Sequence, residues 1–411
     1  MQIHVFSPKI KKMNLPGPEH RQLCDAPADK LVKQLFDKYG DKTARQIYLN
    51  IIHTFSEIDI QSLPDEIVDF HKKNQAKIKI KYPEKIEMAA DFFQHYGHSM
   101  FLVLITKSLP QIYANYRGVK VLYETGYLLG KDNDALVARR LMETAQFFID
   151  IMSKGSFHHN QYGFFAATKV RIIHAYARKF MWDRDWNKKF AQEFDQPVCQ
   201  EDMTLTLLAF SVCNIEGIRK MGLVVTDEQA DAIVYTWHIA GKLLGVLDKF
   251  NPEYFDEGQQ VFHHILNKEK KLGMENKALV DAILNFMRTV FSPSFIINTP
   301  LRKQNKLPEV LVSYLVGKEI SPYIGLNYYS DNYYKHVLNG VELLLPSFFI
   351  NSRKNKLAEA IVSDNFAKII AGIFTYIKST YKMEFRIQEA ILIDWKINKY
   401  LKEYGKPTIS L

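Results

Sequence analysis

Cysteine, glycine and proline are scarce in this chain of 411 residues, and each scarcity excludes a class of protein. The three cysteines form no C-x-x-C pair, which excludes a disulfide framework and a cysteine zinc site and suits a reducing cytoplasm. With only 19 glycines and 15 prolines, low-complexity segments are absent, and apolar residues instead recur at spacings of three and four. We therefore predict an all-α protein in the cytoplasm.

Long apolar runs are also missing. The most apolar stretches, at 100–106, 205–213 and 341–350, are shorter than the roughly 18 to 20 residues that span a bilayer. The N-terminus has neither an apolar signal core nor twin arginines. We expect no transmembrane segment and no export signal, and at most peripheral contact with a membrane.

Long runs of one charge sign are absent as well. The 54 Lys and Arg residues against 45 Asp and Glu give a net charge of +9, but the basic residues are dispersed and no nucleic-acid motif occurs. We expect a solvated basic surface without a nucleic-acid partner, and anionic lipid stays open. The common hydrolase, NTPase and dinucleotide motifs are absent too.

Interruptions of the helical period divide the chain into three parts. We predict a helical cap over 1–60, a core over 61–295 and a helical extension over 296–411 packed on the core. The helical pattern covers 44–55, 88–291, 357–380 and 387–404, with a further helix at 335–345 and an irregular segment at 292–334. Within the core, breaks are predicted at 108–110, 155–163, 195–201 and 249–256.

The most informative segment is the predicted helix FFAATKVRIIHAYARKFMW at 164–182. At 100° per residue it has an apolar face, formed by Val170, Ile173, Ala177, Phe180 and Met181. Arg171, His174 and Arg178 form a stripe beside that face. A porphyrin has a similar division, since it is an apolar disc with two carboxylates at one edge. Periodicity alone leaves open a histidine that only packs between helices, with solvated arginines around it.

Four segments in a fixed order resemble the latex-clearing-protein and MpaB-like family. The run VRIIHAYAR resembles its R-x-x-H-A-x-x-R signature through Arg171, His174 and Arg178. The run RLMETAQF resembles the family's R-x-x-x-T element through Arg140 and Thr144. The run QEDMTLTLLAFS resembles its Q-x-D-x-x-x-T helix through Gln200, Asp202 and Thr206. Residues 108–128 resemble the segment that opens the family core. Together they cover roughly residues 90 to 215.

The resemblance implies a large helical domain with a globin-like core that holds one noncovalent heme b, which here would be the core at 61–295. It implies an oxygenase that uses dioxygen to oxidise or cleave a hydrophobic, unsaturated, isoprenoid or lipid-like substrate. His174 would be the iron ligand, and Arg140, Arg171, Arg178 and Thr206 would bind or support the cofactor. Thr144 would line the distal pocket.

Each of these residues also has a structural interpretation. The Thr144 hydroxyl could bond to the carbonyl of Arg140, and Arg140 could pair with a carboxylate such as Asp202. Gln200 and Asp202 stand where a helix should start, so capping its first turn suits them better. Thr206 could be ordinary polar packing in the core.

The sequence departs from the latex-clearing branch at two distal positions. That branch has a lysine directly before the threonine that corresponds to Thr144, and this chain has Glu143 there. It also has a histidine two residues after the threonine that corresponds to Thr206, and this chain has Leu208 there. Glu124 falls at the place of the branch's acid–base glutamate, although a helical projection puts it off the apolar face. These departures keep a second hypothesis open, a non-enzymatic helical protein that binds heme or a lipid.

Other histidines offer weaker metal sites. His95 and His98 lie three residues apart and could face a metal together, but no carboxylate completes a non-heme iron triad. The adjacent pairs at 158–159 and 263–264 point in different directions on a helix, so we expect surface positions for them.

Overall fold

The computed structural model describes most of the chain, and its regular elements are helices. It describes residues 15–53, 60–126, 133–158, 161–291, 306–334, 356–381, 385–397 and 399. Within this part of the chain no strand forms, and the only β-type pairing is an isolated bridge between Asn115 and Lys270. The prediction of an all-α protein is confirmed.

The described ranges contain the following helices. The α-helices are α1 (Ala26–His53), α2 (Asp65–Ala76), α3 (Pro83–Val103), α4 (Leu109–Ile112), α5 (Tyr116–Glu124), α6 (Asn133–Met152), α7 (Tyr162–Asp183), α8 (Trp186–Lys189), α9 (Ala191–Phe194), α10 (Gln200–Leu208), α11 (Asn214–Lys220), α12 (Asp227–Leu244), α13 (Phe255–Glu269), α14 (Met274–Phe291), α16 (Leu307–Val316), α18 (Lys356–Tyr381) and α19 (Glu389–Asp394). The same ranges also contain two π-helices, η3 (Leu104–Ser108) and η4 (Ala209–Cys213). They further contain four short 3-10 helices: η1 (Pro18–Gln22), η2 (Ile60–Ser62), η5 (Asp248–Phe250) and η6 (Ser321–Ile324).

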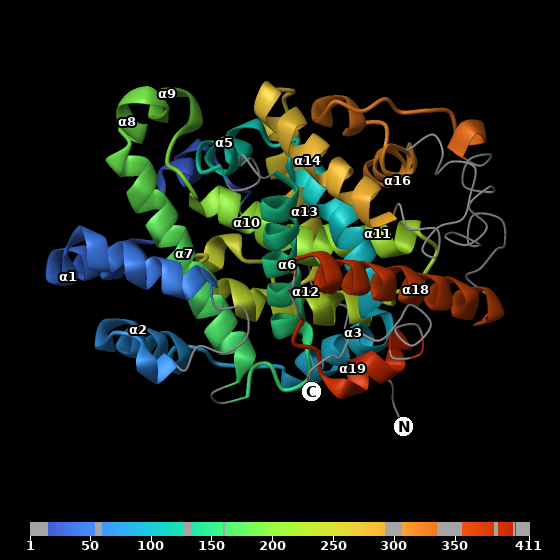
Figure 1. Cartoon of the computed structure of the whole chain (residues 1–411), viewed down its shortest axis with the longest axis horizontal. Coiled ribbons are helices and arrows are strands. Elements are labelled where there is room, and N and C mark those ends of the chain that lie inside the picture. The colour runs from blue at the N-terminus through green and yellow to red at the C-terminus, as the bar shows by residue number, and fades with distance from the viewer. Residues whose placement is uncertain are drawn as a thin grey trace.

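Helix α7, the predicted histidine helix, is surrounded by other helices. It packs against α1 and α2 on one side and against α6 and α12 on the other. Figure 1 shows it crossing the molecule beside α1 and α2. A helix in this position must present side chains to neighbours in several directions, so its environment decides which face is most buried.

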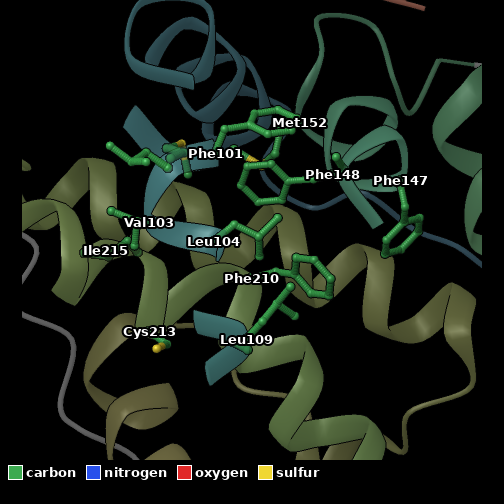
Figure 2. Packing of buried hydrophobic residues seen from close by; sticks show 14 of the residues in the cluster. Phe101, Val103, Leu104, Leu109, Phe147, Phe148, Met152, Phe210, Cys213 and Ile215 are labelled. Carbon is green, nitrogen blue, oxygen red and sulfur yellow. The ribbon is translucent and has the colours of Figure 1, made fainter. Parts of the chain in front are cut away.

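The main hydrophobic core lies between α3, α6, α10, α12 and their neighbours. Three aromatic rings stack at its centre: Phe210 lies parallel to Trp237, with ring centroids 4.7 Å apart, and Phe148 lies 5.6 Å from the same indole. Figure 2 shows Phe148 and Phe210 close together among the aliphatic side chains. Part of the high aromatic content therefore fills this core.

The N-terminal helix is longer than predicted. We expected helix only over 44–55, but α1 already begins at Ala26. Pro27 stands in the first turn, where its missing N–H costs nothing, and Gly40 adopts φ 75°, which kinks the helix without ending it. Neither residue therefore prevents a helix over 26–43.

The other boundaries mostly follow the prediction. The breaks at 155–163 and 195–201 are confirmed within a residue or two, and α18 confirms the helix at 357–380. The break predicted at 249–256 begins earlier, after α12 ends at Leu244, and contains η5. At 108–110 the structure has a helix boundary rather than a loop: η3 ends at Ser108, α4 begins at Leu109, and Pro110 occupies the first turn of α4. Helix α19 is shorter than the predicted 387–404, and the helix at 335–345 lies outside the described residues.

No helix in the described ranges combines the length and apolar character that crossing a bilayer requires.

Candidate functional site

The two sides of α7 differ in burial in a way that periodicity did not predict. Arg171 and Arg178 are buried, the latter with no exposed surface. The apolar stripe with the histidine keeps partial exposure instead; it consists of Val170, Ile173, His174 and Ala177. The side of α7 that carries Arg171 and Arg178, which could have been solvated, therefore faces the protein interior. The apolar stripe with His174 faces the more open region.

His174 has a buried ring nitrogen without a partner. Its Nδ1 atom is inaccessible and makes no hydrogen bond, although the residue as a whole keeps some accessible surface. Burial, reinforced by the positive charge of Arg178, lowers the pKa of His174 to about 3. The imidazole is therefore neutral at physiological pH, which is the form that binds a metal ion.

Arg171 is held by three neighbouring elements. Its Nε and Nη2 atoms donate to the Asp25 carboxylate over 2.6 and 2.8 Å, which is a bidentate pair. Its Nη1 atom donates to the Asn74 side-chain oxygen over 2.8 Å. Asn74 in turn donates to the carbonyl of Leu243 over 2.8 Å, so this network also satisfies the end of α12.

Arg178 is anchored in the same way one turn beyond His174. Its Nε atom donates to Asp29 over 2.6 Å and its Nη1 atom to the carbonyl of Val198 over 3.2 Å. Its Nη2 atom is buried and makes no hydrogen bond. One guanidinium edge near His174 therefore keeps an unused donor.

Helix α6 also has a partly exposed side, and this side lies next to α7. Its partly exposed residues include Leu136, Arg140, Glu143 and Thr144. Arg140 pairs with Glu143 over 2.6 Å, and Arg139 pairs with the same carboxylate over 3.1 Å. Burial lowers the pKa of Lys169, on α7, while the nearby Glu143 opposes this shift.

The structure decides two of the alternatives for these residues. The Thr144 hydroxyl donates to the carbonyl of Arg140 over 2.9 Å, so the expected back-bond is present. Arg140 does pair with a carboxylate, but the partner is Glu143 rather than Asp202, which accepts from the buried Arg21 over 3.0 Å. Arg21 lies 174 to 181 residues from its carboxylate partners in the chain, so no local sequence pattern indicated these pairs.

The elements at the start of α10 serve mainly to hold helices together. Asp202 accepts from the backbone N–H of Cys199, as a capping residue does. Gln200 is fully buried and bonds to the carbonyls of Cys24 and Gly245 and to the N–H of Leu247. Thr206 is exposed, and its hydroxyl donates to the carbonyl of Asp202 over 2.9 Å, so it is not a buried core residue.

Glu124 ends α5, on the side of that helix that meets α14. Its carboxylate pairs with Lys120 over 3.0 Å, and Lys120 also pairs with Glu275 of α14 over the same distance. The Glu124 carbonyl accepts from Arg184, just beyond the end of α7. The carboxylate is thus held by a lysine rather than placed beside His174 by a hydrogen bond.

The rival histidine sites gain no support. His98 is buried against Trp395, whereas His95 is exposed and bonds to the carbonyl of Asp91, so the two do not share an accessible face. His263 pairs with Glu216, and His264 bonds to the carbonyl of Pro16; both are half-buried rather than on the open surface. Within the described residues no three His, Cys, Asp or Glu side chains form a metal-binding group.

A surface groove of about 630 Å³ lies along α3, away from the histidine helix. Its lining comes from Glu84, Glu87, Met88, Asp91, Phe92, His95, Tyr96 and Gln229, none of which belongs to α6 or α7. The groove therefore does not lead to His174, and the chemistry of the α6 and α7 residues is the better guide to the site.

Sequence reasoning missed the carboxylates that hold α7. Asp25 and Asp29 are one helical turn apart, and each takes one arginine of the histidine helix. The two arginines are seven residues apart and the two aspartates four, and nothing in the sequence indicated that these segments meet.

Three comparisons with known proteins agree with one another. The family model "ER-bound oxygenase mpaB/B'/Rubber oxygenase, catalytic domain" matches residues 102–327, which is more than half of the chain. A rubber oxygenase from Streptomyces sp. (strain K30) is 22% identical over 149 residues, a match that spans 36% of this chain and 36% of that protein. The structure of latex clearing protein LCP in the closed state shares the fold, with a TM-score of 0.62 and 15% identity over 96% of this chain and 95% of that one. The family prediction is confirmed, and the chain belongs to the mpaB and rubber oxygenase catalytic-domain family.

Proposed function

We propose that this chain is a heme b dependent oxygenase in which His174 is the iron ligand supplied by the protein. The observation that carries the proposal is the histidine itself, which is neutral, makes no hydrogen bond and stands in an apolar, partly exposed stripe of α7. A purely structural histidine would be expected to bond to a neighbouring carbonyl. The residues present therefore fit a porphyrin placed beside α7.

The basic residues around His174 divide into two groups for this role. Arg171 is engaged by Asp25 and Asn74, which favours a part in positioning α7. Arg178 keeps a buried donor, and Arg140 stands on the partly exposed side of α6, so these two suit the propionates better. Thr144 would line the distal side, and exposed Thr206 would contact the cofactor edge.

The proposed reaction oxidises or cleaves a hydrophobic, unsaturated substrate with dioxygen. When bound, heme supplies the activation of dioxygen. The apolar stripe of α7 would exclude water and receive an apolar, isoprenoid or lipid-like molecule. Glu124 remains the proposed proton carrier; because Lys120 holds its carboxylate, this role requires the pair to open when substrate binds.

Absorption spectroscopy of the purified chain, reconstituted with hemin, tests the cofactor proposal. We expect a Soret band that is lost in His174→Ala and kept in His95→Ala, a matched change of an exposed histidine. A chain that stays colourless after reconstitution, or a His174→Ala variant with an unchanged Soret band, would refute the proposal.

A second function is favoured by the distal substitutions. Glu143 and Leu208 stand where the latex-clearing branch has a lysine and a histidine, and Glu143 is held by two arginines. A heme- or lipid-binding protein without oxygenase activity would tolerate these changes. Oxygen consumption with a panel of isoprenoids and unsaturated lipids separates the two, since the carrier would consume none above the substrate-free rate.

A further inference from the structure

Five lysines form an exposed row between the end of α2 and the start of α3. We name this row the lysine ridge; its members are Lys72, Lys73, Lys77, Lys79 and Lys81. Over 71–82, which contains the ridge, no acidic residue is present, whereas the chain as a whole has 45 acidic residues among 411. The ridge is therefore a local concentration of positive charge on a chain whose other basic residues are dispersed.

The backbone directs Lys77, Lys79 and Lys81 outward. Between residues 77 and 82 exposure alternates, so lysines point outward while Ile78, Ile80 and Tyr82 pack against the main core. The N–H groups of Lys81 and Tyr82 both donate to the Tyr235 hydroxyl of α12, over 2.9 and 3.1 Å. At about 3.3 Å per residue, alternate lysines are about 7 Å apart.

Most of the charge of the ridge is not neutralised by the protein. Lys72, Lys73, Lys77 and Lys79 make no ion pair with any carboxylate in the described ranges. Some exposed lysines elsewhere in the same ranges are paired, as Lys38 is with Glu66, whereas isolated ones such as Lys189 are not. An unpaired row of cations on a fixed backbone attracts an extended anionic surface.

We propose that the lysine ridge binds a bilayer that contains anionic phospholipids. A flat row of alternating lysines suits a plane of headgroups, and each lysine near such a surface strengthens binding about fivefold. Single-stranded nucleic acid fits less well, because its recognition uses exposed aromatic rings and Tyr82 packs inward. The inference does not depend on heme, although a bilayer would also be a reservoir of hydrophobic substrate for the proposed oxygenase.

Vesicle sedimentation with the full chain tests the ridge. The vesicles are pure phosphatidylcholine, or phosphatidylcholine with 30 mol% phosphatidylserine. We expect binding only to the anionic vesicles, and its loss in 0.5 M salt, where charges more than a few ångströms apart are screened. The variant Lys73→Gln/Lys77→Gln/Lys79→Gln should bind on the order of 100-fold more weakly.

A control variant, Lys188→Gln/Lys189→Gln/Lys318→Gln, removes the same charge from exposed positions on other elements and should bind like the unchanged chain. Circular dichroism checks that both variants fold, which surface lysine changes should not disturb. Equal binding to both vesicle types, or an equal loss in both variants, would overturn the proposal. Comparable ridge-dependent binding of single-stranded DNA would reassign the ridge to nucleic acid.

Discussion

The pair between Asp25 and Arg171 is the clearest place to test how α7 is held. Asp25 precedes α1 and accepts both ends of the guanidinium fork, and its side chain is only 2% exposed. Asp25→Ala would leave a buried guanidinium without its counter-charge, which typically costs 3 to 5 kcal/mol. Arg171 would keep its bond to Asn74, so we expect about 3 kcal/mol of lost stability.

Equilibrium unfolding in guanidinium chloride, followed by circular dichroism, measures this loss. The control is Asp41→Ala, which removes one partner of the exposed pair with Arg45, where the side chains are 66% and 47% exposed. That change should cost at most about 1 kcal/mol. The double variant Asp25→Ala/Arg171→Met should recover most of the loss, because neither charge then remains buried alone.

The reasoning fails if Asp25→Ala destabilises the chain no more than Asp41→Ala. It also fails if the double variant is less stable than Asp25→Ala, since Arg171 would then contribute through packing or through Asn74 rather than through the carboxylate. A midpoint shift with an unchanged slope assigns the loss to stability rather than to a change in compactness.

Three further predictions concern single residues. His174 has a folded pKa of about 3, below its ordinary 6.5, so in acid the unfolded chain binds a proton that the folded chain does not. The free energy of unfolding should therefore fall as the pH drops below 6.5, by about 2 kcal/mol at pH 5. Denaturant titrations of the apo protein at pH 7.5 and 5 should show that His174→Phe loses this part of the acid sensitivity. Gly245→Ala should destabilise by about 1 to 3 kcal/mol, because φ is 85° and the added Cβ would lie 2.4 Å from the Asp25 carboxylate; a melting temperature equal to that of the unchanged chain would contradict this. Thr226→Ala removes the hydroxyl that accepts from the N–H of Gln229 at the start of α12 and should cost about 1 kcal/mol, whereas Thr226→Ser should cost less than half as much.

Helical content and the identity of the key helix followed from the sequence alone. Apolar spacing of three and four specified helices, because side chains that far apart share one face, and glycine and proline marked most of the breaks correctly. The order of short motifs around His174 then led to the family that the comparisons confirm. These features are local, and local patterns are what a sequence displays directly.

Only the tertiary structure decided which side of α7 faces the protein. Periodicity grouped Arg171 and Arg178 beside the apolar face, but their partners Asp25 and Asp29 lie 146 and 149 residues away in the chain. A buried guanidinium needs a carboxylate close by, and no local pattern reports where the chain brings one. Once those pairs bury the arginine side, the apolar stripe with His174 is left partly open, and this exposure is what makes it a candidate site.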